Sequence, residues 1–415
     1  MTTARAGTLL ALILAAAFAI RLFVVLSERG RPLAGDETTY DEIAWNVASG
    51  HGYSRGAAGE TLLRPTALRG PAYVLFVAAC YRVAGRVPTV PLALQAVLDA
   101  VAALLAYRLA ATWFGRSSIA LVAAALVAFY PPFVQSASSL LTETLTTVLL
   151  LGALLTFFAG LERPRPVLMF ASGILLGVAA LSKPQLAPAG LVLIVAALPR
   201  LGRRRALQSA AVLMAATALV MAPWVARNAI VFHAFVPGVS LGRLNLWFGS
   251  GAFGDAIGGL DHPSVPDSVR LRVGRMSEIE ADRYALEPAR RAILEHPGRY
   301  AILTIRKLFR LVFNLGYAQP PSRASLLVAI VHAAAIALSV IGARALRPRP
   351  PAGRALLLLG IFWIAVHVPF VPVVRYALPF LAVLFVFTAA GLVAVIERVL
   401  PSARDRAVAV HGRQA

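Results

Sequence analysis

The chain has 415 residues, of which 59% are hydrophobic and only 14% are charged, and its formal net charge is +21. This balance excludes an ordinary soluble domain and places the chain in a bilayer. The basic residues lie in short clusters between apolar stretches, a pattern that sets membrane orientation, so we expect no nucleic-acid partner. Cys80 is the single cysteine, so the chain contains no internal disulfide.

Apolar stretches recur along the whole chain. A spanning helix needs about 20 mostly apolar residues, and we predict ten spans, at residues 7–26, 91–111, 117–134, 140–160, 167–183, 186–199, 206–225, 325–345, 354–372 and 376–396. Lipid offers no partners for free backbone groups, so the predicted fold class is all-α. The first stretch is too long for a signal peptide and lacks a clear small-residue cleavage site, and we expect it to remain as an anchor.

Six basic clusters fall on one side of the membrane if ten helices span it. They are Arg5; Arg108 and Arg116; Arg163 and Arg165; Arg200 with Arg203–Arg205; Arg344, Arg347, Arg349 and Arg354; and Arg398, Arg404, Arg406 and Arg413. Loops rich in arginine stay in the cytoplasm. We therefore predict one membrane domain over residues 1–415 in the cytoplasmic (inner) membrane, with both termini and a basic tail (400–415) in the cytoplasm. Two long loops, 27–90 and 226–324, then face outward.

Two further apolar stretches, 71–85 and 300–316, are predicted not to span. The first is too short. The second mixes Arg306, Lys307 and Arg310 with an apolar stripe, as is typical of a helix that lies in the membrane interface. That stripe consists of Ile302, Ile305, Phe309 and Phe313.

The first outer loop opens with four acids in seven positions, namely Asp36, Glu37, Asp41 and Glu42. Residues 36–49 are predicted to form a short helix with Asp36 as its cap, because an apolar stripe recurs at helical spacing. The stripe, expected to lie on the membrane surface, is Tyr40, Ile43, Ala44 and Val47. Gly50 and Gly52 can end the helix with positive φ. A solvated outer face explains any single acid, but the clustering favours a functional site.

Charged residues also stand at the ends of predicted spans. Glu143 begins an apolar run, where an acid is costly and by default marks a partner or a site. Lys183 and Arg375 end spans on the outer side, at the depth where a lipid phosphate sits, although snorkelling explains either one alone. Arg21, inside the first span, either snorkels outward or pairs with a buried acid.

These residues resemble the GT-C superfamily of polytopic glycosyltransferases that use polyprenyl-phosphate sugars, particularly bacterial relatives of protein O-mannosyltransferases and of aminoarabinose transferase. The resemblance covers most of the chain, and its motifs occur in a fixed order. They are Gly35-Asp36-Glu37 with Tyr40, Gly50–Tyr53, Pro65–Tyr73, Thr142-Glu143, Leu181–Pro184, Ala222–Asn228, Asn245–Gly249, His296–Tyr300 and Arg375–Pro379. The chain departs from the pattern at Arg69-Gly70-Pro71-Ala72, which lacks paired prolines, and at Thr39, where some relatives carry arginine.

The resemblance implies a GT-C fold and transfer of a hexose or pentose from a polyprenyl-phosphate donor to an acceptor hydroxyl on the outer face, with inversion. The acceptor class, whether lipid, glycan or protein, is not indicated. Asp36 is the expected general base, and Glu37 is expected to position either Asp36 or the acceptor. Glu37 together with the interface is expected to raise the pKa of Asp36. The expected substrate-binding residues are Tyr40, Arg64, Arg69, Glu143, Lys183, Arg227, Asn245, Arg375 and Tyr376.

A cofactor is not required by this chemistry. A divalent metal stays open, with Glu37, His51 and Glu143 as its ligands, because hard cations favour carboxylate oxygens. Two alternative functions also stay open. A transporter or flippase for a lipid-linked glycan would typically show internal repeats and charges near the bilayer midplane, whereas the charges here collect at one face. A glycan polymerase would not be expected to begin with an acidic first loop.

Overall fold

The computed structural model describes residues 3–56, 62–162, 165–255, 258–313, 323–345 and 351–399. The predicted basic tail at 400–415, residues 347–350 of the basic linker, and Arg163 lie outside these residues. Within the described part the chain is almost entirely helical, and its only sheet is a two-stranded antiparallel pair, β1 (Ser54–Arg55) with β2 (Arg64–Pro65). The predicted all-α fold class is confirmed.

Six helical segments among the described residues are long and apolar enough to cross a membrane. They contain α1 (Thr3–Ser27), α4 (Thr89–Phe114), α7 (Glu143–Glu162), α9 (Ala189–Phe232), α14 (Arg323–Ala345) and α16 (Leu378–Val399). Four shorter apolar helices are α3 (Pro71–Ala84), α5 (Ser117–Phe129), α8 (Pro166–Ser182) and α15 (Ala352–His367). The chain is thus a multi-pass membrane protein, and each predicted span overlaps one of these helices, although several bounds differ, most clearly for 354–372, whose helix α15 ends at His367.

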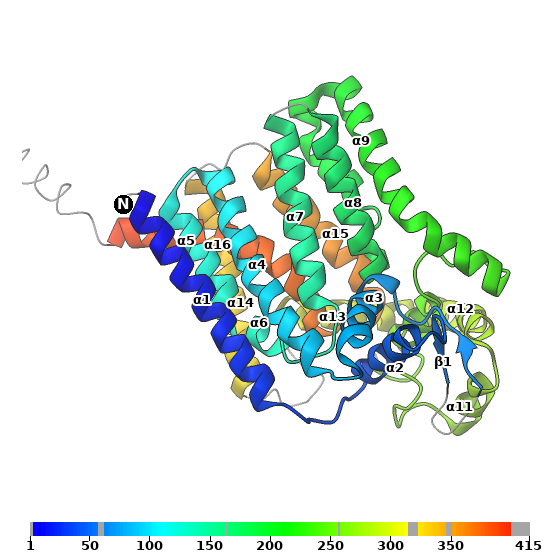
Figure 1. The fold of residues 1–415 in the computed structure, drawn as a ribbon. Helices are drawn as coiled ribbons and strands as arrows, with labels where there is room; N and C mark the ends of the chain where they lie inside the picture. The colour runs from blue at the N-terminus through cyan, green and yellow to red at the C-terminus, as the bar shows by residue number, and fades with distance from the viewer. Residues whose placement is uncertain are drawn as a thin grey trace, which may run out of the picture.

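Two predicted spans join in α9, and one predicted span is interrupted. In α9 the backbone is non-helical at Gly202 (φ 70°, ψ 161°), and the two arms on either side of it stand next to each other in Figure 1. Gly202 separates the predicted spans 186–199 and 206–225. The stretch 117–134 breaks at Tyr130 (φ −67°, ψ 121°) into α5 and α6 (Pro131–Ser136), because the residue before a proline is pushed out of the helical region.

Small residues let the long helices approach closely. The closest case is Gly391 on α16, where an added Cβ would lie 1.9 Å from the carbonyl oxygen of Leu338 on α14. Such contacts are typical of helix pairs in membranes, because the backbones come near enough to gain dispersion energy that lipid tails do not replace.

A set of shorter elements covers one end of the bundle, opposite the end at which α1 begins (Figure 1). We call this the loop-bearing end. It carries α2 (Asp36–Ala48), α3, the two strands, α10 (Gly242–Gly249), α11 (Asp267–Gly274), α12 (Glu278–Glu295) and α13 (Pro297–Phe313). These elements come from the two predicted outer loops.

The apolar stripe of α2 packs on protein and not on the membrane surface, so that prediction is wrong. Tyr40, Ile43 and Ala44 are buried in one cluster with Tyr73 and Val77 of α3. Residues 71–85 supply an apolar helix too short to span, and this helix covers the stripe instead of lipid. The helix bounds themselves, and the positive φ of Gly50 (84°) and Gly52 (72°), are confirmed.

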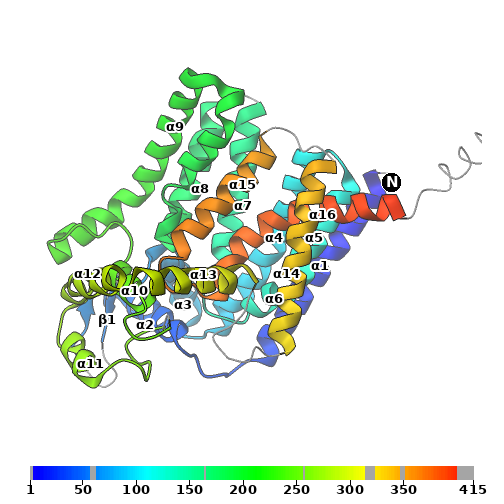
Figure 2. The same cartoon turned by 180° about the vertical axis from the view of Figure 1, so that it is seen from behind.

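Helix α13 runs across the direction of α7, α8 and α15 (Figure 2). Its apolar side chains Ile302, Ile305 and Phe309 are exposed, whereas Lys307 is fully buried. The Lys307 Nζ donates to the carbonyls of Gly249 (2.9 Å), Pro369 (3.0 Å) and Phe370 (3.2 Å). A crosswise helix with its apolar side outward agrees with the interfacial position predicted for it.

Arg21 is buried inside the bundle and does not snorkel. Its Nε lies 3.2 Å from Asp99 Oδ2 of α4, and its Nη atoms donate to the carbonyls of Ala17, Val127 and Ala128. One acid and three carbonyls therefore surround one guanidinium. The structure selects the pairing alternative, with Asp99 as the acid.

Candidate active site

Asp36 is the first residue of α2 and lies at the loop-bearing end. The residue before it, Gly35, has φ 58° and ψ −123°, so the chain enters the helix through a left-handed conformation that favours glycine. Gly35 and not Asp36 is the N-cap, and no side chain caps the helix, so the predicted capping role is wrong. The Asp36 carboxylate is instead used by two guanidinium groups, those of Arg69 and Arg375.

Arg375 joins Asp36 to a second carboxylate. Its Nε lies 3.6 Å from Glu143 Oε1, and Lys183 Nζ donates to the same oxygen at 3.1 Å. The Glu143 side chain is 3% exposed and that of Lys183 6%. Five residues from five separate segments thus form one ionic cluster: Asp36, Arg69, Glu143, Lys183 and Arg375.

Two tyrosine rings flank the cluster. Lys183 Nζ lies 4.4 Å from the centre of the Tyr376 ring, and the Arg69 guanidinium lies 5.1 Å from the centre of the Tyr40 ring. A cation over an aromatic face is attracted by the ring quadrupole, most strongly where water is excluded. Tyr40 and Tyr376, both predicted as binding residues, therefore hold cations of the cluster.

The cluster carries more positive than negative charge. Three cations and two carboxylates give a formal charge of +1, because three minus two is one. Several of its buried polar atoms, Glu143 Oε2, Arg69 Nε and Arg375 Nε, have no hydrogen-bond partner among the described residues. Buried polar groups are normally satisfied. The excess positive charge suits an anionic ligand.

The pKa of Asp36 is held below its ordinary value of 3.8, so the expectation of a raised pKa is wrong. Burial alone would raise it, but the charges and hydrogen bonds of Arg69 and Arg375 outweigh burial. The Glu37 carboxylate does not raise the pKa of Asp36, because its charge is neutralised by Arg31. Asp36 is therefore ionised at neutral pH.

The other acids of α2 hold the loop together. Glu37 receives two hydrogen bonds from Arg31 (2.8 and 2.9 Å) and the backbone N–H groups of Leu140 (2.9 Å) and Ala34 (3.2 Å). Glu37 thereby ties the entry of α2 to the segment before Glu143. Asp41 binds Tyr81 and Arg86, and Glu42 binds Arg55 and the Gly56 N–H. Of the four acids, only Asp36 joins the cluster.

Arg227 lies at the end of α9, where it binds backbone of the first loop. Its Nη atoms donate to the carbonyls of Thr66 (2.8 Å) and Tyr53 (2.9 Å). The Tyr53 hydroxyl donates to the Arg69 carbonyl at 2.8 Å. Arg227 therefore supports the segment that carries Arg69, and it makes no direct contact with the cluster.

Besides Glu37 and Arg227, three more predicted residues are not brought into the cluster. Arg64 is exposed on β2, His51 is exposed after α2, and Asn245 lies half-buried on α10. Glu37 is bound to Arg31, and among the described residues no group of three or more His, Cys, Asp or Glu side chains is placed to hold a metal. The structure therefore does not gather Glu37, His51 and Glu143 into one set of ligands.

Sequence reasoning missed two supports of the site. Glu278, the first residue of α12, accepts hydrogen bonds from the Thr66 hydroxyl (2.8 Å) and the Ala67 N–H (2.7 Å), which ties the second loop to the first. The His367 ring of α15 lies 5.6 Å from the Tyr376 ring, and its Nε2 is hydrogen-bonded to Gln185, two residues after Lys183. Glu278 follows Ser277, which begins a capping box. That motif signals the start of α12 in the sequence, but it does not indicate that Glu278 binds Thr66.

Comparison with known proteins adds a family match and several fold matches. A model of the family described as dolichyl-phosphate-mannose-protein mannosyltransferase matches residues 68–226. No curated protein matches the chain. The structure of the oligosaccharyltransferase AglB from Archaeoglobus fulgidus, in complex with an inhibitory peptide and a dolichol-phosphate, shares 16% identity at a TM-score of 0.58. That match covers 94% of this chain and 50% of AglB, so the chain spans about half the length of AglB.

ArnT from Cupriavidus metallidurans, bound to undecaprenyl phosphate, also matches, with 16% identity, a TM-score of 0.44, and coverage of 92% of this chain and 76% of ArnT. The helices and the cluster at their loop-bearing end define a polytopic membrane protein with an ionic site beside its two long loops. Its fold resembles that of AglB.

Proposed function

We propose that the chain is a membrane glycosyltransferase that moves a sugar from a polyprenyl-phosphate donor to an acceptor hydroxyl, with inversion at the anomeric carbon. The observation that carries the proposal is the cluster itself. One partly exposed carboxylate, that of Asp36, is paired with Arg69 and Arg375 at the end of the bundle where the loops gather, and a third cation, Lys183, joins the cluster through Glu143. AglB, which has the same fold, was solved with a dolichol-phosphate, and the matching family is named for a dolichyl-phosphate donor.

The cations Arg69, Lys183 and Arg375 would serve the leaving group. When the bond between the anomeric carbon and the phosphate oxygen breaks, the electron pair stays on that oxygen, and the lipid phosphate gains charge. Guanidinium and ammonium groups aimed at developing charge in a water-poor site stabilise the transition state strongly. Glu143 is buried and paired with two of these cations, so its role is to position Lys183 and Arg375.

Asp36 would take the proton from the acceptor hydroxyl as its oxygen attacks the anomeric carbon. A base must be ionised at working pH, and the two arginines keep Asp36 so. A carboxylate that served as a nucleophile would give a covalent intermediate and net retention. With Asp36 as base, a single displacement gives inversion. Glu37 fixes the entry of α2 and so positions Asp36 at one remove.

The site would face outward from the cytoplasmic membrane. The loop-bearing end lies opposite the start of α1 (Figure 1). The positive-inside tendency assigns the Arg5 side of α1 to the cytoplasm. The acceptor would then be a hydroxyl of a lipid, glycan or protein outside the cell.

The test is turnover by purified protein in nanodiscs supplied with a panel of polyprenyl-phosphate hexoses and pentoses, together with lipid, glycan and protein acceptors that carry free hydroxyl groups. We expect release of the lipid phosphate from at least one donor, and NMR of the product should show the inverted anomer. Asp36→Asn should release it about 10²- to 10⁴-fold more slowly, whereas Glu42→Gln, which changes an acid on the same helix outside the cluster, should behave as wild type.

A retained anomer would contradict the role of Asp36 as base. Absence of turnover with every donor, together with movement of a fluorescent lipid-linked glycan across proteoliposomes, would favour the transporter alternative.

A further inference from the structure

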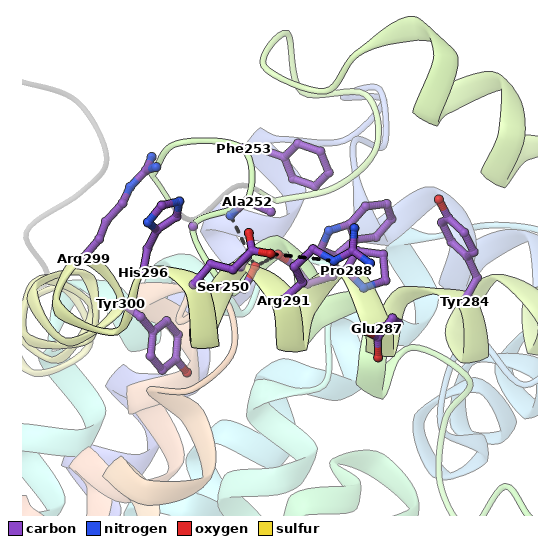
Figure 3. A pocket seen from close by; sticks show the side chains of 14 residues that line it. Ser250, Ala252, Phe253, Tyr284, Glu287, Pro288, Arg291, His296, Arg299 and Tyr300 are labelled. Carbon is purple, nitrogen blue, oxygen red and sulfur yellow. Dashed lines mark hydrogen bonds and ion pairs between the residues drawn. The ribbon is translucent and has the colours of Figure 1, made fainter.

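A cavity of about 620 Å³ lies in the large second loop (Figure 3), and none of the five cluster residues lines it. Its walls come from α10, the loop that follows it, α12 and the start of α13. Figure 3 shows Glu287 and Arg291 along α12, with His296, Arg299 and Tyr300 at the next helix start. Sites for organic ligands typically have volumes of about 300–1,000 Å³.

The charges that line this cavity cancel. Two carboxylates, Glu287 and Glu295, face two guanidinium groups, Arg291 and Arg299. The ionic cluster, in contrast, has an excess of one positive charge. A neutral set of donors and acceptors does not favour a phosphate or a metal ion, but it can hydrogen-bond a ligand with many hydroxyl groups.

The polar groups of the cavity have hydrogen-bonding capacity to spare. The side chains of Glu287, His296 and Arg299 make no hydrogen bond or ion pair within the described residues. The pair Arg291–Glu295 is loose at 4.0 Å, with both side chains more than 60% exposed.

Aromatic rings complete the lining. Phe253, Tyr284 and Tyr300 are half-buried, and Trp247 backs two of them, with ring centroids 5.0 Å from Phe253 and 5.8 Å from Tyr284. Rings beside planar polar side chains match the two aspects of a sugar, its apolar C–H face and its hydroxyl rim. A purely apolar ligand would leave the charged groups desolvated at a cost.

The cavity is connected to the cluster by a short piece of chain. Tyr300 donates to the Pro369 carbonyl at 3.2 Å, and Lys307 joins the carbonyls of Gly249 and Phe370. Gly249 directly precedes the cavity residue Ser250. Phe370 is five residues from Arg375, and five residues extend at most about 18 Å. A chain of a few sugar units can cover such a distance.

We infer that this cavity binds the saccharide part of the acceptor and presents its terminal hydroxyl toward Asp36. The inference rests on the proposed transferase function, and it names the acceptor class as a glycan or glycolipid. Because no residue of the cluster lines the cavity, the cavity affects binding of the acceptor and not cleavage of the donor.

The first test measures binding without catalysis. Saturation-transfer NMR would be recorded on the full-length protein in nanodiscs with mannotriose, maltotriose and galactotriose as probes. We expect a signal from at least one trisaccharide, about tenfold weaker binding in Arg291→Ala, and a similar loss in Phe253→Ala. Arg290→Ala is the matched control, because Arg290 neighbours Arg291 on α12 but does not line the cavity; it should bind as wild type.

The second test uses turnover. Arg291→Ala should raise KM for a glycan acceptor about tenfold while kcat and donor hydrolysis stay unchanged. Saccharide binding without any sugar transfer would overturn the proposed function but not the cavity assignment. Sugar transfer to a glycan with no trisaccharide signal and an unchanged KM in Arg291→Ala would overturn the inference alone. Binding of inorganic phosphate, or of an unglycosylated peptide in place of the trisaccharides, would overturn it as well.

Discussion

Two groups of charges are built into this apolar protein, and they differ in how completely they are neutralised. Inside the bundle, Arg21 meets one acid, Asp99, and three backbone carbonyls, and both side chains are almost fully buried. At the loop-bearing end, Asp36 and Glu143 face three cations, and Asp36 is 30% exposed. The first group is balanced and closed, as suits a structural pair. The second is unbalanced and reachable, which is what binding and proton transfer need.

Substitution of Arg375, in the cluster at the loop-bearing end, should have a large effect on activity. Arg375→Ala would leave both Asp36 and Glu143 short of a partner and remove a cation from the leaving phosphate. We expect kcat to fall about 10²- to 10³-fold, the usual effect of removing one group that stabilises developing charge. Arg116→Ala is the control. It removes an exposed arginine that is paired with Glu397 of α16, outside the cluster, and it should change kcat less than twofold. Equal effects of the two substitutions would contradict the assignment.

Substitution of the buried pair Arg21–Asp99 should lower the stability of the fold and not act on the chemical step. Arg21→Ala leaves the Asp99 charge buried without its partner, which typically costs about 3–5 kcal/mol of unfolding free energy. We expect a clear drop in Tm by a detergent thermal-shift assay. The double variant Arg21→Leu/Asp99→Leu should recover much of it, because no buried charge remains. A Tm unchanged in Arg21→Ala would mean that the pair is not closed.

Substitution of Arg227 should affect both local structure and activity. It holds the carbonyls of Tyr53 and Thr66 and so supports the segment that carries Arg69. Arg227→Ala should loosen residues 53–69, with faster amide hydrogen exchange there and about tenfold lower activity, the equivalent of about 1.4 kcal/mol. Loss of activity without faster exchange would point instead to direct contact with the donor.

The pH dependence gives the smallest and most specific effect. Since the pKa of Asp36 in the folded protein lies below 3.8, its ion pairs contribute stability above that pH, and the contribution disappears as the pH falls through the folded-state value. The ratio kcat/KM reports the free enzyme, so it should be level from about pH 5 to 7 on the acid side. An acid limb near pH 6 would show that another group, or a relaxed Asp36, acts as the base.

The sequence predicted the helices, the acid-rich entry of α2 and most of the cluster, because apolar length and charges at the ends of spans are local signals. It did not predict which charges pair. The guanidinium groups of Arg69 and Arg375 lie 33 and 339 positions from Asp36, and only folding brings them together. The same holds for Asp99. The predicted rise in the pKa of Asp36 was wrong for the same reason, because the charge of its sequence neighbour Glu37 is neutralised by Arg31.

The apolar stripe of α2 shows a second limit of prediction from sequence. An apolar stripe on a membrane protein fits lipid or protein equally well by composition, and only α3 decides that Tyr40, Ile43 and Ala44 face protein. The position of Glu278 has the same character, because a helix start is readable from the chain but its partner Thr66 is not.

The central claim is that Asp36 performs the chemical step at a site where other residues bind the donor phosphate. The direct measurement is a single-turnover experiment on Asp36→Asn that records donor binding and sugar transfer separately. The account predicts donor affinity within a few-fold of wild type and a transfer step slower by about 10²- to 10⁴-fold. A transfer step as fast as in wild type would contradict it.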